Sequence, residues 1–98
     1  MNAGYVYYKD QVCLFLHEGD LVSEVAGVDL SYKTMGWLHE HSLCENFRGE
    51  YLRETYDDIH GILEPYAIDE RDIRMLCEDI MVIASGRIDR FLRTAPGQ

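Results

Sequence analysis

Residues 5–26 read YVYYKDQVCLFLHEGDLVSEVA, three runs of β-branched, aromatic and aliphatic residues separated by two short polar breaks. Runs of this kind, bounded by turn-forming residues, are typical of strands. The break at residues 9–11 predicts a hairpin with a three-residue loop. The break at residues 18–20 leads into a third run that alternates in hydrophobicity as far as Ala26, and Gly27 is expected to end it. The stretch therefore predicts an antiparallel meander of two or three strands.

Three helices are predicted after the sheet, over residues 32–47, 50–64 and 69–93. Within each segment the apolar residues recur every three or four positions, as they do on the buried side of a helix. Asp69 is expected to cap the last helix, because its carboxylate can accept a hydrogen bond from a backbone N–H of the first turn. Gly86 is a weak point at which that helix could kink or break, since an interior glycine costs about 1 kcal/mol relative to alanine.

The length of 98 residues suits one domain with a single hydrophobic core. The strands come first in the chain and the helices afterwards. We therefore predict a single α+β domain, residues 1–98, in which a short antiparallel meander within residues 5–26 is followed by three helices packed on one of its faces.

Several features of the sequence predict a cytoplasmic protein. The longest uninterrupted apolar runs, such as residues 80–84, are five residues long, and the N-terminus lacks the basic and apolar regions of a secretion signal. The cysteines are odd in number, far apart and flanked by apolar residues. Cys13, Cys44 and Cys77 are therefore expected to be small buried residues in a reducing compartment rather than disulfide partners.

The charge of the chain is strongly negative and unevenly distributed. Eighteen acidic against nine basic residues give a formal net charge of −9, and residues 50–79 alone carry ten acids and three bases. A chain this acidic is repelled by nucleic acid and by anionic membranes. Direct binding to DNA, RNA or a membrane is therefore not expected, and a helix-turn-helix reader built from the last helices is disfavoured.

The acids of residues 50–79 are expected to form one exposed surface. On a helix over residues 50–64 they lie about one turn apart, on the side away from the apolar stripe. The surface is either a solvated face that serves solubility or a binding site for a basic partner, and we expect tyrosines beside it to supply apolar anchoring. The predicted contact residues are Glu50, Glu54, Asp57, Asp58, Glu64, Asp69, Glu70 and Asp72, with Tyr51, Tyr56 or Tyr66 as anchors.

The leading functional hypothesis is a non-enzymatic inhibitor that needs no cofactor. The sequence has no glycine-rich phosphate loop and no motif that would orient a nucleophile, so no catalytic residues are predicted. A carboxylate surface suits the basic, nucleic-acid-binding patch of a partner such as a nuclease. Small acidic domains of this class include immunity proteins, antitoxins, phage-encoded DNA mimics and anti-CRISPR proteins, and the likeness is one of class only.

Two further hypotheses belong to other classes of protein. The first is a small metal-binding enzyme or sensor in which His41 and Cys44, three residues apart on one helix, bind an ion together with Cys13 or His17. The second is a homo-oligomeric accessory subunit, because the segment Ile80–Ala84 is apolar on every side and must be covered by its own domain or by a second copy.

Overall fold

The computed structural model describes residues 1–30 and 47–94, and its order of elements confirms the α+β class. The strands are β1 (Asn2–Tyr8), β2 (Gln11–Glu18) and β3 (Leu21–Asp29), and the helices are α2 (Phe47–Leu63) and α3 (Glu70–Thr94). Within the described residues two helices follow the sheet, so the prediction of three is wrong. The helix predicted over residues 32–47 lies outside the described residues, apart from Phe47, which begins α2.

The sheet is an antiparallel meander in the order β1-β2-β3, joined by two-residue turns. Tyr8 pairs with Gln11, so the predicted three-residue loop is wrong. Lys9 and Asp10 both have positive φ, 47° and 67°. This is the backbone of a type I′ turn, whose twist matches that of the flanking strands. In the second turn Gly19 adopts the positive φ, which glycine does without steric cost.

The third strand runs beyond its predicted end at Ala26. Gly27 pairs with Cys13, and the ladder continues to Asp29 because β2 still offers a partner as far as Gln11. Leu14 pairs with Ala26 while Phe15 pairs with Glu24, so Val25 is the extra residue of a β-bulge. Glycine weakens a strand but does not end one whose neighbouring strand still has partners to offer.

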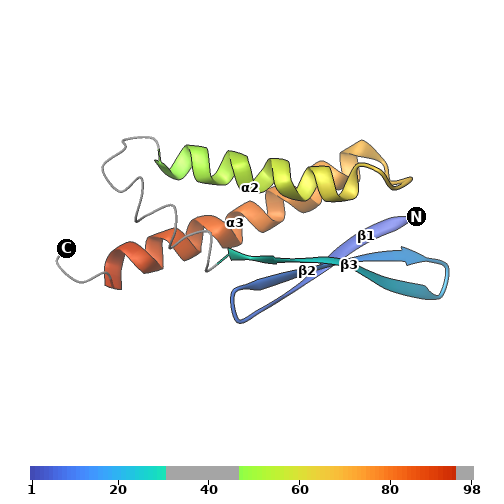
Figure 1. Ribbon diagram of the computed structural model, residues 1–98, viewed down its shortest axis with the longest axis horizontal. Helices are drawn as coiled ribbons and strands as arrows, with labels where there is room; N and C mark the ends of the chain where they lie inside the picture. Colours follow the sequence, from blue (N-terminus) through green and yellow to red (C-terminus); the bar gives the residue numbers. More distant parts are fainter. Residues whose placement is uncertain (31–46, 95–98) are drawn as a thin grey trace.

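Both helices lie on the same side of the sheet, with α3 nearer to the strands, as Figure 1 shows. The inward side chains of all five elements form one core. The largest fully buried side chains are Val12, Leu14, Leu30, Tyr51, Thr55, Ile59, Leu63, Ile73, Cys77, Ile80 and Ile88. Among the described residues no element covers the opposite face of the sheet, where Val6, Tyr8 and Val22 are exposed.

The start and the length of α3 follow from its sequence. The Asp69 carboxylate accepts a hydrogen bond from the backbone N–H of Arg71 at 2.8 Å, which confirms the predicted cap. The helix then continues through Gly86 without a break. The buried residues on either side, Ala84 and Ile88, hold this turn of the helix against the core. Packing therefore outweighs the low helix propensity of the glycine.

Polar contacts fix α3 to its neighbours. Arg87 Nε lies 2.9 Å from Asp10 Oδ1, and the Tyr7 hydroxyl donates to the same carboxylate oxygen at 3.2 Å, so the β1–β2 turn is attached to the helix. On the side toward α2, the Arg48 guanidinium donates to Ser85 Oγ at 3.1 Å and forms an ion pair with Asp89. The relative positions of sheet and helices are thus fixed by charged contacts as well as by the core.

Candidate protein-binding surfaces

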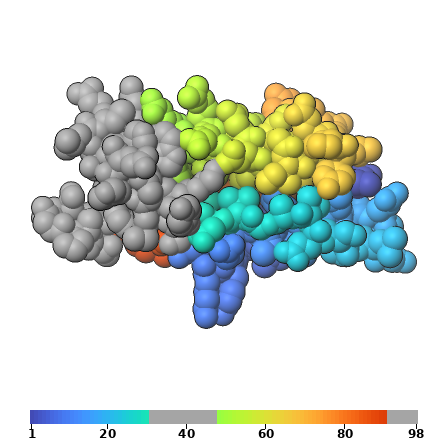
Figure 2. All heavy atoms as spheres, viewed as in Figure 1, coloured from blue at the N-terminus to red at the C-terminus, as the bar shows by residue number. Residues whose placement is uncertain are grey.

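The outer side of α2 carries a row of exposed carboxylates. Glu50, Glu54 and Asp57 are exposed, whereas Tyr51 and Thr55 on the same helix are buried. Successive residues of a helix are rotated by about 100°, which places these three acids on the side opposite the core residues. The helix lies along one long side of the molecule, green and yellow in Figure 2, and the three acids are exposed on it.

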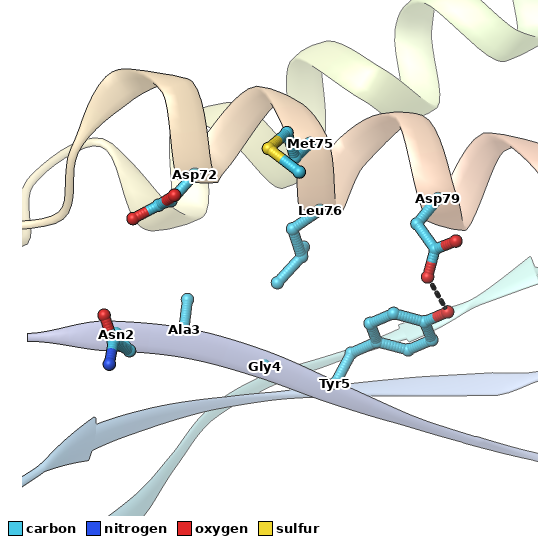
Figure 3. Close-up of a pocket in the computed structure, with 8 residues that line it drawn as sticks. All are labelled: Asn2, Ala3, Gly4, Tyr5, Asp72, Met75, Leu76 and Asp79. Atoms are coloured by element: carbon cyan, nitrogen blue, oxygen red, sulfur yellow. Dashed lines mark hydrogen bonds between the residues drawn. The ribbon is translucent and has the colours of Figure 1, made fainter.

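The remaining predicted acids divide between this helix, the turn after it and the far side of α3. Asp58 and Glu64 are exposed on α2 and just beyond its end. Asp69 caps α3, and its side chain is therefore engaged with the backbone. Asp72 faces β1 rather than the outer side of α2, as Figure 3 shows. The structure thus brings together the acids of α2, but not the whole predicted set.

His60 occupies the centre of the acidic region at the junction of the two helices. Its Nε2 lies 2.7 Å from Glu70 Oε1, and its Nδ1 lies 3.9 Å from Glu64 Oε2. The hydrogen bond to Glu70 raises the pKa of His60; burial opposes this, and the charges of Glu70, Glu64 and Asp57 add to it. Two of the predicted contact acids, Glu64 and Glu70, therefore share an internal partner that is a cation when protonated.

The three tyrosines differ in what they can offer a partner. Tyr51 is only 1% exposed and its hydroxyl donates to the backbone oxygen of Leu30, so it belongs to the core and cannot anchor a partner. Tyr56 is half-buried and its ring stacks on that of His60, with 6.4 Å between the centroids. Tyr66, in the turn after α2, is 39% exposed. Of the predicted anchors, Tyr66 is thus the best placed.

A second feature, which the sequence did not reveal, is a groove of about 590 Å³ between β1 and α3. Residues Asn2 to Tyr5 form one wall and α3 forms the other, as Figure 3 shows. The helix contributes Asp72, Met75, Leu76 and Asp79. One sequence signal points to this wall of the groove: Asp72 and Asp79 are seven residues apart, which places both on one side of a helix. Nothing in the local sequence indicates which strand lies beside them.

The two walls of the groove are joined at one end by a hydrogen bond. The Tyr5 hydroxyl donates to a carboxylate oxygen of Asp79, the contact drawn in Figure 3. This bond, followed by burial and by the negative charge of Asp79, raises the pKa of Tyr5. The phenol therefore stays protonated at neutral pH and remains the donor, and it holds one carboxylate at a fixed position over the strand.

The structure gives no support for the alternative metal site or for a reactive cysteine within the described residues. His41 and Cys44 lie outside the described residues, and within the described ranges no group of three or more His, Cys, Asp or Glu side chains is placed to hold a metal ion. Cys77 is buried, and burial raises the pKa of its thiol to about 11. A thiol of this kind is a poor nucleophile at neutral pH.

The apolar segment Ile80–Ala84 is covered largely from within the chain. Ile80 and Ala84 are fully buried in the core, Met81 and Ile83 are half-buried, and Val82 is 71% exposed. A homodimer through this segment would therefore have Val82 at its centre, and it stays a prediction. Neither α2 nor α3 combines the length and the apolarity that a membrane-spanning helix needs.

Comparison of the chain with protein-family models, with curated proteins and with solved structures gives no match. Two surfaces of the molecule can therefore indicate its function, the outer side of α2 and the groove between β1 and α3.

Proposed function

We propose that the protein is a non-enzymatic, acidic binding module that docks the outer side of α2 on a basic patch of another protein. The partner class is a nuclease or another protein whose basic patch normally holds nucleic acid, and docking would block that patch. This is the mode of action of DNA mimics, immunity proteins and antitoxins as a class. The odd number of cysteines, far apart along the sequence, favours a cytoplasmic setting for this activity.

The observation that carries the proposal is the row formed by Glu50, Glu54 and Asp57 on the outer side of α2. Like charges at a spacing of three or four residues on a helix repel one another, so the row costs some folding stability. A cationic partner would relieve that repulsion, and opposite charge would speed its association. The contacts expected are charge-assisted hydrogen bonds to Arg and Lys.

Burial and contacts within the fold support a proposed contact surface that is smaller than the predicted set of residues. Asp69 and Glu70 have roles inside the fold, as a helix cap and as the partner of His60. Tyr51 is buried. The proposed surface is therefore centred on α2, with Tyr66 as the apolar anchor at its end. It consists of Glu50, Glu54, Asp57, Asp58, Glu64 and Tyr66.

The test is affinity capture from host lysate, with each retained protein identified, at low and at high ionic strength. One variant replaces Glu50 and Glu54 with glutamine and Asp57 with asparagine. The matched control neutralises three exposed acids of the β2–β3 hairpin, Glu18→Gln, Asp20→Asn and Glu24→Gln, which changes the net charge equally.

We expect wild type and the hairpin variant to retain the same basic partner at low ionic strength, and the α2 variant to lose it. Salt should weaken the capture, since screening reduces attraction between exposed charges. Equal retention by the two variants would reject α2 as the contact surface. Circular dichroism of each variant establishes that the fold is unchanged.

A further inference from the structure

We infer that the groove between β1 and α3 binds an extended, basic peptide segment, which adds to β1 as a fourth, antiparallel strand. The inference goes beyond the proposed function, because the groove uses other residues than the outer side of α2. Each of the two proposals can therefore fail without the other.

The first support is the open edge of β1. A two-residue hairpin closes on a hydrogen-bonded pair, here Tyr8 with Gln11, and such pairs alternate along an antiparallel ladder. The N–H and C=O groups of Ala3 and Tyr5 therefore point away from β2. In the described residues β1 is an edge strand, so these groups are available to a guest strand.

The second support is the shape of the space beside that edge. α3 stands over β1 and closes the groove on one side, so a guest strand would have β1 along its edge and the helix above it, as Figure 3 shows. The volume of about 590 Å³ lies within the range of ligand-binding clefts. The strand itself carries no charge from Asn2 to Tyr8, which lowers the desolvation cost of pairing.

The third support is charge, which selects the guest. Asp72 and Asp79 lie at the two ends of the groove with Leu76 between them. Seven residues of helix separate the two aspartates by about 10 Å. Alternate residues of an antiparallel guest point toward α3, and the first and fifth of a five-residue segment are about 13 Å apart. The flexible side chains of Lys and Arg are long enough to make up the difference of about 3 Å between these two spacings.

The recognised sequence is therefore basic-x-aliphatic-x-basic. The two Lys or Arg side chains would meet the Asp72 and Asp79 carboxylates, and the aliphatic side chain between them would pack on Leu76. Backbone bonds to Ala3 and Tyr5 would supply sequence-independent affinity, as in other complexes in which a peptide extends a sheet.

The probe is the peptide Ser-Thr-Lys-Thr-Leu-Thr-Lys-Thr-Ser, titrated into the full chain and followed by backbone amide NMR shifts. We expect saturable shifts at Ala3 and Tyr5 and slower hydrogen exchange of these two amides. The paired substitution Asp72→Asn with Asp79→Asn should weaken binding about fivefold, the effect of losing two exposed ion pairs. Asparagine at position 79 still accepts the Tyr5 hydrogen bond.

Two controls separate strand addition from general attraction to acidic protein. The variant Glu50→Gln with Asp57→Asn loses the same charge on α2 and should bind the peptide as wild type does. N-methylation of the leucine in the peptide removes an N–H that faces β1 and should abolish binding. N-methylation of the threonine before it removes an N–H that faces away and should leave binding in place.

Any of three results would overturn the inference: no saturable shift at Ala3 and Tyr5, equal weakening by the α2 pair, or equal effects of the two N-methylations. A dimer in sedimentation equilibrium that protects the Ala3 and Tyr5 amides and excludes the peptide would do so as well. That result would assign the edge to a second copy of the chain.

Discussion

At the scale of single residues, His60 has the widest influence. It lies on α2, yet its hydrogen bond reaches Glu70 at the start of α3, and it stacks on Tyr56 one turn earlier. It therefore connects the two helices at the turn between them. It also sets the charge of the acidic region locally, because its protonation offsets one of the carboxylates around it.

Replacing His60 with glutamine should remove a contribution to stability that depends on pH. Because the pKa of His60 is raised in the folded state, its contribution is fully present below the unfolded value of about 6.5 and is lost as pH rises through the folded value. The difference in unfolding free energy between wild type and His60→Gln should therefore shrink as the pH is raised from well below about 6.5 into the alkaline range. It should stay below about 1 kcal/mol, because Glu70 is exposed.

Urea titrations across that pH range measure the effect. Glu70→Gln serves as the control, since it removes the carboxylate that pairs with His60. Its difference in unfolding free energy from wild type should shrink over the same pH range. A difference that stays constant with pH would mean that His60 acts through packing on Tyr56 alone.

Arg87 should contribute to stability through the β1–β2 turn. Its side chain is 15% exposed and that of Asp10 is 29% exposed, so the pair is partly shielded from solvent. Replacing Arg87 with methionine keeps the packing of the stem, removes the cation beside the Asp10 carboxylate and retains the hydrogen bond from the Tyr7 hydroxyl, at an expected cost of about 1 kcal/mol. Thermal unfolding measures it. Arg71→Met, at an exposed site, should change stability by less than about 0.5 kcal/mol.

At the scale of elements, both helices carry glycines that the fold does not require. Gly61 and Gly86 lie inside α2 and α3, both are exposed, and a Cβ built on either would meet no atom within 4 Å. The helices form because their apolar sides pack on the core, although glycine is a poor helix former. Low propensity at these positions is therefore a cost that a substitution can remove.

Gly86→Ala and Gly61→Ala should each raise the unfolding free energy by about 0.5–1 kcal/mol, because alanine loses less backbone entropy on folding. Urea unfolding with unchanged m-values would measure this. Gly19→Ala is the contrasting variant: its φ of 62° strains any residue with a Cβ, so stability should fall. A loss of stability in Gly86→Ala would show that this turn of α3 needs the conformational freedom of glycine.

At the scale of the whole molecule, acids from one stretch of the sequence, residues 50–79, become separated in space. Glu54 and Asp57 face outward from α2, whereas Asp72 and Asp79 face β1 from the other side of α3. The molecule thus has two negative surfaces with different neighbours: one is an open helix side, and the other is a groove along a strand edge.

Replacing Glu54 with lysine should raise the stability of the fold and weaken the proposed binding to a basic partner. In Glu54→Lys the new cation lies four residues after Glu50 and four before Asp58, so repulsion becomes attraction. The unfolding free energy should rise by about 0.5 kcal/mol, while capture of the basic partner falls. A variant that is more stable and still binds fully would place the contact elsewhere.

The sequence alone determined the elements, because their signals are local. Alternating and helical periodicities located three strands and two of the helices, and the carboxylate of Asp69 indicated where α3 begins. The predicted bounds of the strands were wrong where pairing with a neighbouring strand decides them. Gln11 belongs to β2 because Tyr8 pairs with it, and Gly27 belongs to β3 because Cys13 pairs with it.

Only the tertiary structure decided which residues make up the two proposed binding surfaces. It buried Tyr51 by packing the inner side of α2, and it directed Asp72 and Asp79 toward β1 by placing α3 over that strand. Periodicity shows which side of an element is buried, but not which element covers it. That choice depends on packing between residues some seventy positions apart, such as Tyr5 and Asp79, and no local pattern in the chain records it.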